Sequence, residues 1–188
     1  MKSVIIEPEK CIGCRHCSLA CAVEHSKSKN LLGVIQETPM PRARIFVDLA
    51  VDQLTFPNRC RHCDPAPCLD ACPSGAIFRD DKTGSILIDQ ARCINCAMCA
   101  MACPFGVIRF FADTRMAGRT SVAIKCDNCV DRQNSQMTPA CVNACKTGAL
   151  KFKEINQAMH ENHLVAIRQE KPPEEIRAWR AMNAVMAG

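Results

Sequence analysis

Cysteine is the residue type with the clearest chemistry in this chain, because it accounts for 16 of the 188 residues. The cysteines fall into four groups of four with none left over, and every group begins with Cys-x2-Cys and ends with Cys-x3-Cys. The groups are Cys11, Cys14, Cys17 and Cys21; Cys60, Cys63, Cys68 and Cys72; Cys93, Cys96, Cys99 and Cys103; and Cys126, Cys129, Cys141 and Cys145. In a reducing compartment, thiols at such regular spacing indicate metal ligands.

The N-terminus favours that compartment. Only residues 4–6 form an apolar run there, whereas the core of a signal peptide spans about 7–15 residues. We therefore expect a cytoplasmic protein, in which disulfides rarely persist. A secreted disulfide scaffold is the alternative if a signal segment has been removed. No apolar run reaches the ~18–20 residues of a membrane span, so we expect no direct membrane span.

The spacing within the groups favours iron–sulfur clusters. Cys-x2-Cys-x2-Cys-x3-Cys is the run by which bacterial ferredoxins place three thiolates on one 4Fe–4S cluster and the fourth on its neighbour. Four groups supply sixteen thiolates, which fits four such clusters. Structural zinc is the alternative, since zinc is often held by two Cys-x2-Cys pairs. In the first and third groups, however, the last two cysteines do not form a second pair of that kind.

Short elements must position these thiols. Strand patterns flank the groups, and the turn-rich residues 80–84 predict a hairpin between two of the strands. The expected strands are residues 3–6, 43–49, 76–79, 85–88, 107–111, 121–125 and 148–155, and short helices are expected at residues 18–25 and 100–103. This pattern predicts an α+β fold in which a small, ferredoxin-like unit appears twice.

With these motifs the sequence resembles the four-cluster iron–sulfur subunits of the dimethyl sulfoxide reductase type, a polyferredoxin family. The resemblance covers about residues 3–155 and includes residues 56–68, where the x4 gap of the second group lies. It implies an outer ferredoxin-like domain of residues 1–55 and 115–155, with an inner one of residues 56–114 nested within it. Residues 156–188 would be a C-terminal extension. Lys146 stands where the family usually has proline.

The resemblance also implies which cysteines share a cluster. The outer domain would hold one cluster on Cys11, Cys14, Cys17 and Cys145 and its neighbour on Cys21, Cys126, Cys129 and Cys141. The inner domain would hold one on Cys60, Cys63, Cys68 and Cys103 and the other on Cys72, Cys93, Cys96 and Cys99.

The sequence contains no nucleophile–base pair and no nucleotide-binding loop, so we expect no catalysis by this chain. The resemblance implies an electron-transfer subunit that connects a large catalytic metalloenzyme subunit to a further redox subunit or ferredoxin-type carrier. Tungsten or molybdenum aldehyde oxidoreductases, formate dehydrogenases and carbon monoxide dehydrogenase or hydrogenase systems are the expected partners. A free-standing polyferredoxin shuttle is the alternative, and self-association into chains is conceivable. The net charge of +5 is not gathered with aromatic residues, so we expect no nucleic-acid binding.

Several other residues carry expectations. The pairs Arg15-His16 and Arg61-His62 lie inside Cys-x2-Cys loops, where backbone amides could donate to sulfur while the side chains either approach a cluster or face solvent. Lys125 and Lys146 flank the fourth group; we expect solvated side chains, with tuning or shielding of a cluster as the alternative. Residues 26–30 are expected to form an exposed loop. Residues 172–186 predict an amphipathic helix, because Pro172, Pro173 and two glutamates precede apolar residues at helical spacing. Core packing and partner docking both remain open for that helix.

Overall fold

The computed structural model describes residues 2–49, 55–112 and 121–168. The chain divides into two compact units, Met1–Phe152 and Lys153–Gly188. All sixteen cysteines lie in the first unit, which therefore contains both predicted modules. The amphipathic helix expected at residues 172–186 lies outside the described residues. Within those residues, no helix combines the length and the apolar character needed to cross a bilayer.

The strands are short, with three to five residues each, and most of them lie between the cysteine groups. They are β1 (Lys2–Ile6), β2 (Phe46–Leu49), β3 (Thr55–Asn58), β4 (Ile77–Arg79), β5 (Ile86–Ile88), β6 (Arg109–Phe111), β7 (Val122–Ile124) and β8 (Leu150–Glu154). In the described part of the chain they form the two-stranded sheets β1–β8, β2–β3, β4–β5 and β6–β7. The last three sheets are antiparallel. The strands expected from the sequence are present, most of them one to three residues shorter.

The helices are also short, and most begin within or directly after a cysteine loop. They are the 3₁₀ helix η1 (Pro8–Lys10) and the α-helices α1 (His16–Glu24), α2 (Leu31–Gln36), α3 (Pro67–Asp70), α4 (Met98–Ala102), α5 (Val130–Asn134), α6 (Ala140–Asn143) and α7 (Ile155–Arg168). The α+β fold class is therefore confirmed, and α1 and α4 appear where helices were expected. The ferredoxin-like nature of two nested modules stays a prediction.

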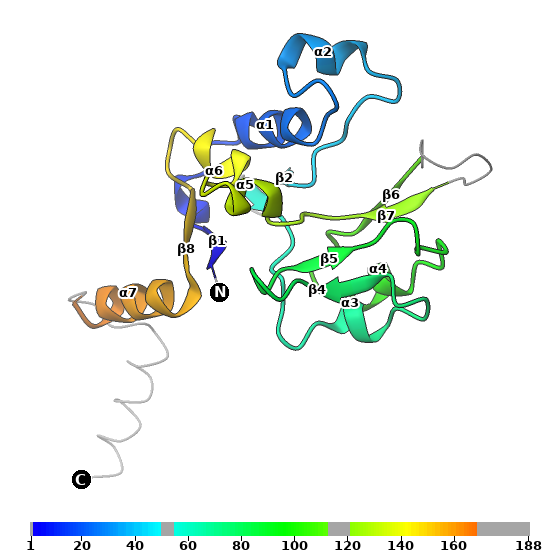
Figure 1. The fold of residues 1–188 in the computed structure, drawn as a ribbon. Helices are drawn as coiled ribbons and strands as arrows, with labels where there is room; N and C mark the ends of the chain where they lie inside the picture. The colour runs from blue at the N-terminus through cyan, green and yellow to red at the C-terminus, as the bar shows by residue number, and fades with distance from the viewer. Residues whose placement is uncertain (1, 50–54, 113–120, 169–188) are drawn as a thin grey trace. The chain divides into compact units, whose positions relative to one another are not determined.

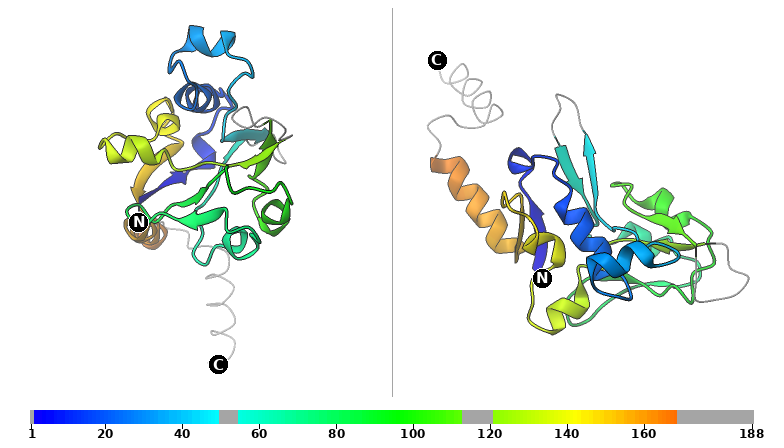
Figure 2. Two further views of the ribbon diagram at one scale, coloured as in Figure 1. Left: turned by 45° about the vertical axis from the view of Figure 1, so that its right-hand side comes forward. Right: turned by 90° about the horizontal axis from the view of Figure 1, so that it is seen from above.

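Segments far apart in the sequence pack together in the first unit. Helix α1 packs against α6, and both lie beside α5 (Figure 1). Helices α3 and α4, from the middle of the sequence, pack against each other near the β4–β5 hairpin (Figure 1). The same two groups of elements can be followed in the further views of Figure 2. The β6–β7 hairpin has one strand on each side of the predicted boundary at residue 114, so that boundary falls inside a hairpin.

The turn between β4 and β5 follows the sequence pattern. The amide of Gly84 donates to the carbonyl of Asp80 at 2.8 Å, and the Thr83 hydroxyl donates to the Asp80 carboxylate at 2.6 Å. The register pairs Ile77 with Ile88 and Arg79 with Ile86. The predicted hairpin is therefore confirmed.

Cysteines make up much of the buried core. One core cluster combines Val4, Ile45 and Leu150 with Cys17, Cys21 and Cys141. A larger one is built around Ile77, Ile86, Ile108 and Val122 together with Cys93 and Cys99. A third joins Cys60, Cys126 and Val107, and so lies where groups two and four of the cysteines meet. With few aromatic residues available, thiols occupy positions that large apolar side chains fill in most proteins.

The long segment between the first two cysteine groups follows expectation only in part. Residues 26–30 form the predicted loop, in which Lys27, Lys29 and Asn30 are exposed, whereas Ser26 is buried and its hydroxyl donates to the Val23 carbonyl at 2.6 Å. Helix α2 was not predicted. It begins because the Asn30 side chain caps it, accepting a hydrogen bond from the Gly33 amide at 2.7 Å.

Candidate metal centres

The first Cys-x2-Cys loop of every group has the same backbone turn. The second residue between the two cysteines is left-handed in each: Gly13 (φ 69°), His62 (φ 52°), Asn95 (φ 59°) and Asn128 (φ 60°). Three of these residues are not glycine, and a left-handed conformation costs such a residue about 1–2 kcal/mol. Strain repeated at equivalent positions indicates a shared function for the four loops.

That turn directs backbone amides toward sulfur. In group two the amide of His62 donates to Cys60 Sγ, and in group four the amide of Asn128 donates to Cys126 Sγ, each at 3.4 Å. The amide of Arg44 donates to Cys21 Sγ at 3.2 Å, from a segment that is distant in sequence. The His62 amide thus contacts a cysteine sulfur, while donation from the Arg61-His62 pair to cluster sulfur stays a prediction. Such donors stabilise a thiolate over a thiol.

Two cavities are walled by cysteines from the middle groups. The lining of one includes Cys72, Cys93, Cys96 and Cys99. The lining of the other includes Cys60, Cys63, Cys68 and Cys103. In each cavity three cysteines come from one group and the remaining one from the other group. These are the two sets that the family resemblance implies for the inner domain.

Cysteines of the first and fourth groups also approach one another. Burial raises the pKa of Cys21 well above its usual value, and the nearby thiolates of Cys126, Cys141 and Cys129 raise it further. Burial likewise raises the pKa of Cys17, and the charges of Cys145 and Cys11 add to this effect. Seven of the eight cysteines assigned to the outer domain therefore lie near a predicted companion. The eighth, Cys14, is exposed.

The arrangement of the thiols fits metal ligation better than disulfide bonding. All sixteen cysteines are free, although they converge in sets. Burial raises the pKa of Cys129 and Cys141 to about 12 and that of Cys99 to about 11, so these thiols hold their protons at neutral pH. Formation of the buried thiolates therefore requires a metal that displaces those protons. Four soft sulfur ligands in each set suit iron–sulfur clusters or zinc.

Two buried donors next to the cysteines point to an additional acceptor. Arg59 Nε and His62 Nε2 are buried and have no hydrogen-bond partner among the described residues. The His62 ring accepts a hydrogen bond from the Ile86 amide at Nδ1, at 3.0 Å, which leaves the proton on Nε2. Burial lowers the pKa of His62 well below its usual value, and the charges of Lys125 and Arg59 lower it further, so the ring is neutral. Inorganic sulfide is an acceptor of the right kind, whereas bound zinc offers none.

The charged residues near the cysteines only partly follow expectation. Arg15 and His16 are exposed, and so is Lys146. His62, by contrast, is only 1% exposed, and Lys125 is only 4% exposed, so the prediction that Lys125 is solvated was wrong. The Lys125 ammonium group donates to the carbonyls of Ile86 and Cys126. Its burial follows from packing between strands β5 and β7, which no local sequence pattern specifies.

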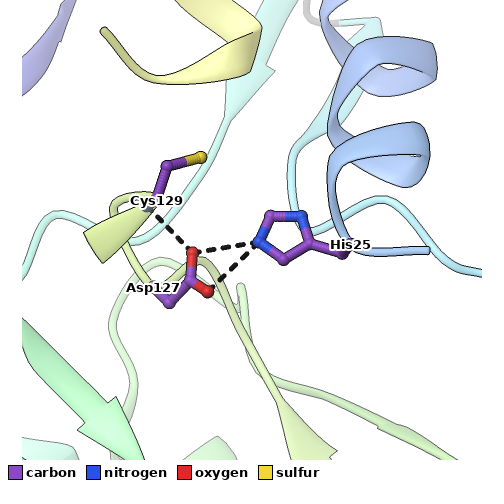
Figure 3. A group of neighbouring side chains, drawn as sticks. All are labelled: His25, Asp127 and Cys129. Atoms are coloured by element: carbon purple, nitrogen blue, oxygen red, sulfur yellow. Dashed lines mark hydrogen bonds and ion pairs between the residues drawn. The ribbon is translucent and has the colours of Figure 1, made fainter. Parts of the chain in front are cut away.

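A histidine and an aspartate form a polar contact beside the fourth group. The ring of His25, at the end of α1, faces the Asp127 carboxylate, and Nε2 lies 3.1 Å from both oxygens (Figure 3). Burial alone would raise the pKa of Asp127, but His25 and Arg44 hold it well below its usual value. His25, Asp127 and Cys129 present possible ligand atoms within 4.8 Å of one another. Because Cys129 belongs to a predicted cluster set, we interpret the contact as a link between α1 and the loop of group four.

Comparison with known proteins identifies the class of these centres. The family model of the 4Fe-4S dicluster domain matches residues 51–155, which is more than half of the chain, and a second model of the same description matches residues 10–77. The chain therefore belongs to the 4Fe-4S dicluster family, which supports iron–sulfur clusters over structural zinc or disulfides.

Individual relatives extend this result. The chain is 36% identical to a protein named "Iron-sulfur protein" of Rhodospirillum rubrum, over 97% of this chain and 96% of the relative. It is 36% identical to "Electron transport protein HydN" of Escherichia coli (strain K12), over 78% of this chain and 85% of the relative. It is 37% identical to "Thiosulfate reductase electron transfer subunit PhsB" of Salmonella typhi, over 82% of this chain and 77% of the relative.

Proposed function

We propose that this chain is a non-catalytic electron-transfer subunit that carries four 4Fe–4S clusters. The observation that carries the proposal is the convergence of thiols into sets of four, two of which wall separate cavities. Two matches to a dicluster domain support four clusters. Relatives named as an electron transport protein and as an electron transfer subunit support the function.

The proposed ligand sets are those that the resemblance implies. Cys11, Cys14, Cys17 and Cys145 hold one cluster, and Cys21, Cys126, Cys129 and Cys141 hold the second. Cys60, Cys63, Cys68 and Cys103 hold the third, and Cys72, Cys93, Cys96 and Cys99 hold the fourth. Each 4Fe–4S cluster supplies one-electron redox chemistry when bound. The protein fixes the positions of the sets, excludes water from them and sets their potentials.

Contacts between the sets support an order of transfer. The charge of Cys17 acts on Cys141, which connects the two outer sets. Cys126 and Cys60 share one core cluster, which connects an outer set to an inner one. The charge of Cys68 acts on Cys99, which connects the two inner sets. Neighbouring sets thus form a single row, with Cys14 exposed in the first set and Cys96 exposed in the last.

We infer a partner of the dimethyl sulfoxide reductase type. In this proposal, electrons pass between a large catalytic subunit with molybdenum or tungsten, or a carbon monoxide dehydrogenase or hydrogenase, and a second redox carrier. Thiosulfate reductase in the name of one relative supports a catalytic companion of this general kind. Gel filtration of a native extract tests the assembly: a subunit elutes with a large chain, whereas the alternative, a free shuttle, elutes near 20.7 kDa.

Iron analysis and paired substitutions test the ligand sets. Protein purified without oxygen should contain about sixteen iron atoms, four for each cluster. Cys21→Ala and Cys126→Ala should each change the same cluster signal in electron paramagnetic resonance (EPR) spectra, and the double variant should change no more than either single one. As the matched comparison, Cys21→Ala with Cys17→Ala should change two signals. If Cys21→Ala with Cys17→Ala changed one signal and Cys21→Ala with Cys126→Ala changed two, each cysteine group would hold its own cluster. Bound zinc without iron would refute the proposal.

A further inference from the structure

A buried arginine lies where the outer and inner cysteine sets meet. Arg59 has no exposed surface. Its guanidinium donates to the Val4 carbonyl at 2.9 Å, to Asn128 Oδ1 at 3.1 Å and to Cys126 Sγ at 3.5 Å. In the sequence, Arg59 follows β3 and directly precedes Cys60. Its guanidinium nevertheless contacts a cysteine of the other predicted module.

A buried lysine makes the reciprocal connection. Lys125 directly precedes Cys126 in the sequence, yet it lines the cavity that is walled by Cys60, Cys63, Cys68 and Cys103. Its charge also lowers the pKa of Cys68, against the larger effect of burial, which raises it. Each of the two sets at the junction thus has a cation supplied by the residue that precedes the first cysteine of the opposite group.

Within the part of the chain that the structure describes, neither Arg59 nor Lys125 forms an ion pair with an acidic side chain. An unpaired buried charge is strongly unfavourable, so a counter-charge is required. The guanidinium of Arg59 lies 3.5 Å from Cys126 Sγ, so a cluster held by that cysteine can supply the counter-charge.

The other two groups have a cation at the same sequence position but in a different environment. Lys10 precedes Cys11 and Arg92 precedes Cys93. Both are exposed, and Lys10 forms an ion pair with Glu7 at 2.6 Å. Solvent screens charges in such positions. The burial of Arg59 and Lys125 is therefore specific to the junction and does not follow from the cysteine motif.

We propose that Arg59 and Lys125 form a permanent positive centre that raises the reduction potentials of the two sets at this junction, and so sets the energy at which electrons cross between modules. A 4Fe–4S core with four thiolates is negatively charged and becomes more so on reduction, so a fixed nearby cation stabilises the reduced form. Low effective dielectric in the interior strengthens the interaction. This inference rests on the proposed function, because it requires clusters in both sets.

The test is an EPR-monitored redox titration of the full-length holoprotein under anaerobic conditions. At the potential where the junction signals of the wild type are half reduced, Arg59→Gln should lower the ratio of reduced to oxidised cluster at least about tenfold, which equals 59 mV for a one-electron couple. Lys125→Met should act in the same direction on the neighbouring set. Arg59→Lys keeps the charge and should restore most of the ratio.

Matched controls separate this role from a structural one. Arg92→Gln and Lys10→Met also remove a positive charge directly before a cysteine group, but at exposed sites. In these variants the ratio of reduced to oxidised cluster, measured at each wild-type midpoint potential, should change by less than about twofold. A purely structural role for Arg59 would lower the iron content and leave the midpoints of the remaining clusters unchanged. If Arg59→Gln does not fold, Lys125→Met and Arg59→Lys still decide the question.

The possible failures are distinguishable. Unchanged midpoints in Arg59→Gln and Lys125→Met with full iron content, or equal shifts in the exposed controls, would overturn this inference alone. A wild-type protein without iron–sulfur signals would overturn the proposed function and the inference with it.

Discussion

Replacement of Gly13 by alanine tests how closely the first cysteine loop packs. Gly13 has a φ of +69°, and a Cβ at this position would lie 2.9 Å from Thr55 Cγ2. The left-handed backbone alone costs alanine about 1–2 kcal/mol. To remove the clash, Thr55 must turn about χ1, and this breaks the 2.8 Å hydrogen bond from its hydroxyl to the Cys11 carbonyl. That loss adds about 0.5–1.5 kcal/mol.

Gly148 provides the matched control. It has nearly the same φ, +70°, and a Cβ there would meet nothing within 4 Å. Gly148→Ala therefore carries the backbone effect without the clash. In thermal unfolding of the anaerobic holoprotein, both variants should unfold below the wild type, at about 2–4 °C for each kcal/mol. Gly13→Ala should have the lower midpoint of the two.

A third variant isolates the methyl group. Thr55→Ser removes Cγ2 but keeps the hydroxyl that donates to Cys11. In the Thr55→Ser background, Gly13→Ala should destabilise the protein no more than Gly148→Ala does. Equal midpoints for the two alanine variants in the wild-type background, or no relief by Thr55→Ser, would refute the described packing of Gly13 against β3.

Three further substitutions have definite expected outcomes. Ile45→Ala, at a position only 2% exposed in a core that also contains Cys17 and Cys21, should destabilise the protein by about 2–5 kcal/mol in chemical unfolding; a change within 0.5 kcal/mol would contradict its place in that core. Burial alone would raise the pKa of Glu24, but hydrogen bonds from Arg132 and Lys29 outweigh this effect and lower the pKa below its ordinary value of 4.5. The ionised carboxylate therefore stabilises the fold at pH values above 4.5, and this contribution is lost as the pH falls through the lowered pKa. Glu24→Gln should therefore destabilise the protein by about 1 kcal/mol at pH 7 and by less at pH 4, measured as the difference from wild type in unfolding midpoint, and a pH-independent difference would argue against the ion pair. His16→Ala, at an exposed position, should keep the full iron content, and loss of one cluster would show that the ring is a ligand.

The cysteine pattern predicted most of the candidate sites. The spacing within each group predicted iron–sulfur ligands, and the family resemblance implied the two sets from groups two and three that line the cavities. The β4–β5 hairpin was also predictable, because its turn depends on the neighbouring residues Asp80, Thr83 and Gly84. The hairpin was accessible from the sequence because the contacts of its turn join residues within about five positions of one another.

The buried cations were not accessible in this way. Lys10, Arg59, Arg92 and Lys125 occupy the same position before a cysteine group, and nothing local distinguishes the two that are buried. Their burial depends on contacts across about 39 to 69 residues of sequence, such as Lys125 with Ile86 and Arg59 with Asn128. Helix α2 has a local sequence signal, because Asn30 is a capping residue that directly precedes apolar residues. The polar residues 26–30 just before it instead indicated a loop.

The thiol-rich core has a consequence for the life of the protein in the cell. Cys17, Cys21 and Cys141 stand in one core cluster and Cys60 and Cys126 in another, at positions where a leucine would stabilise the fold by itself. Metal binding and folding are therefore coupled, and a newly made chain that has not acquired iron has little else to hold it closed. Such a chain is a substrate for proteases, since degradation follows the unfolded population. The steady-state amount of this protein should consequently follow the supply of iron and sulfide, even at a constant rate of synthesis.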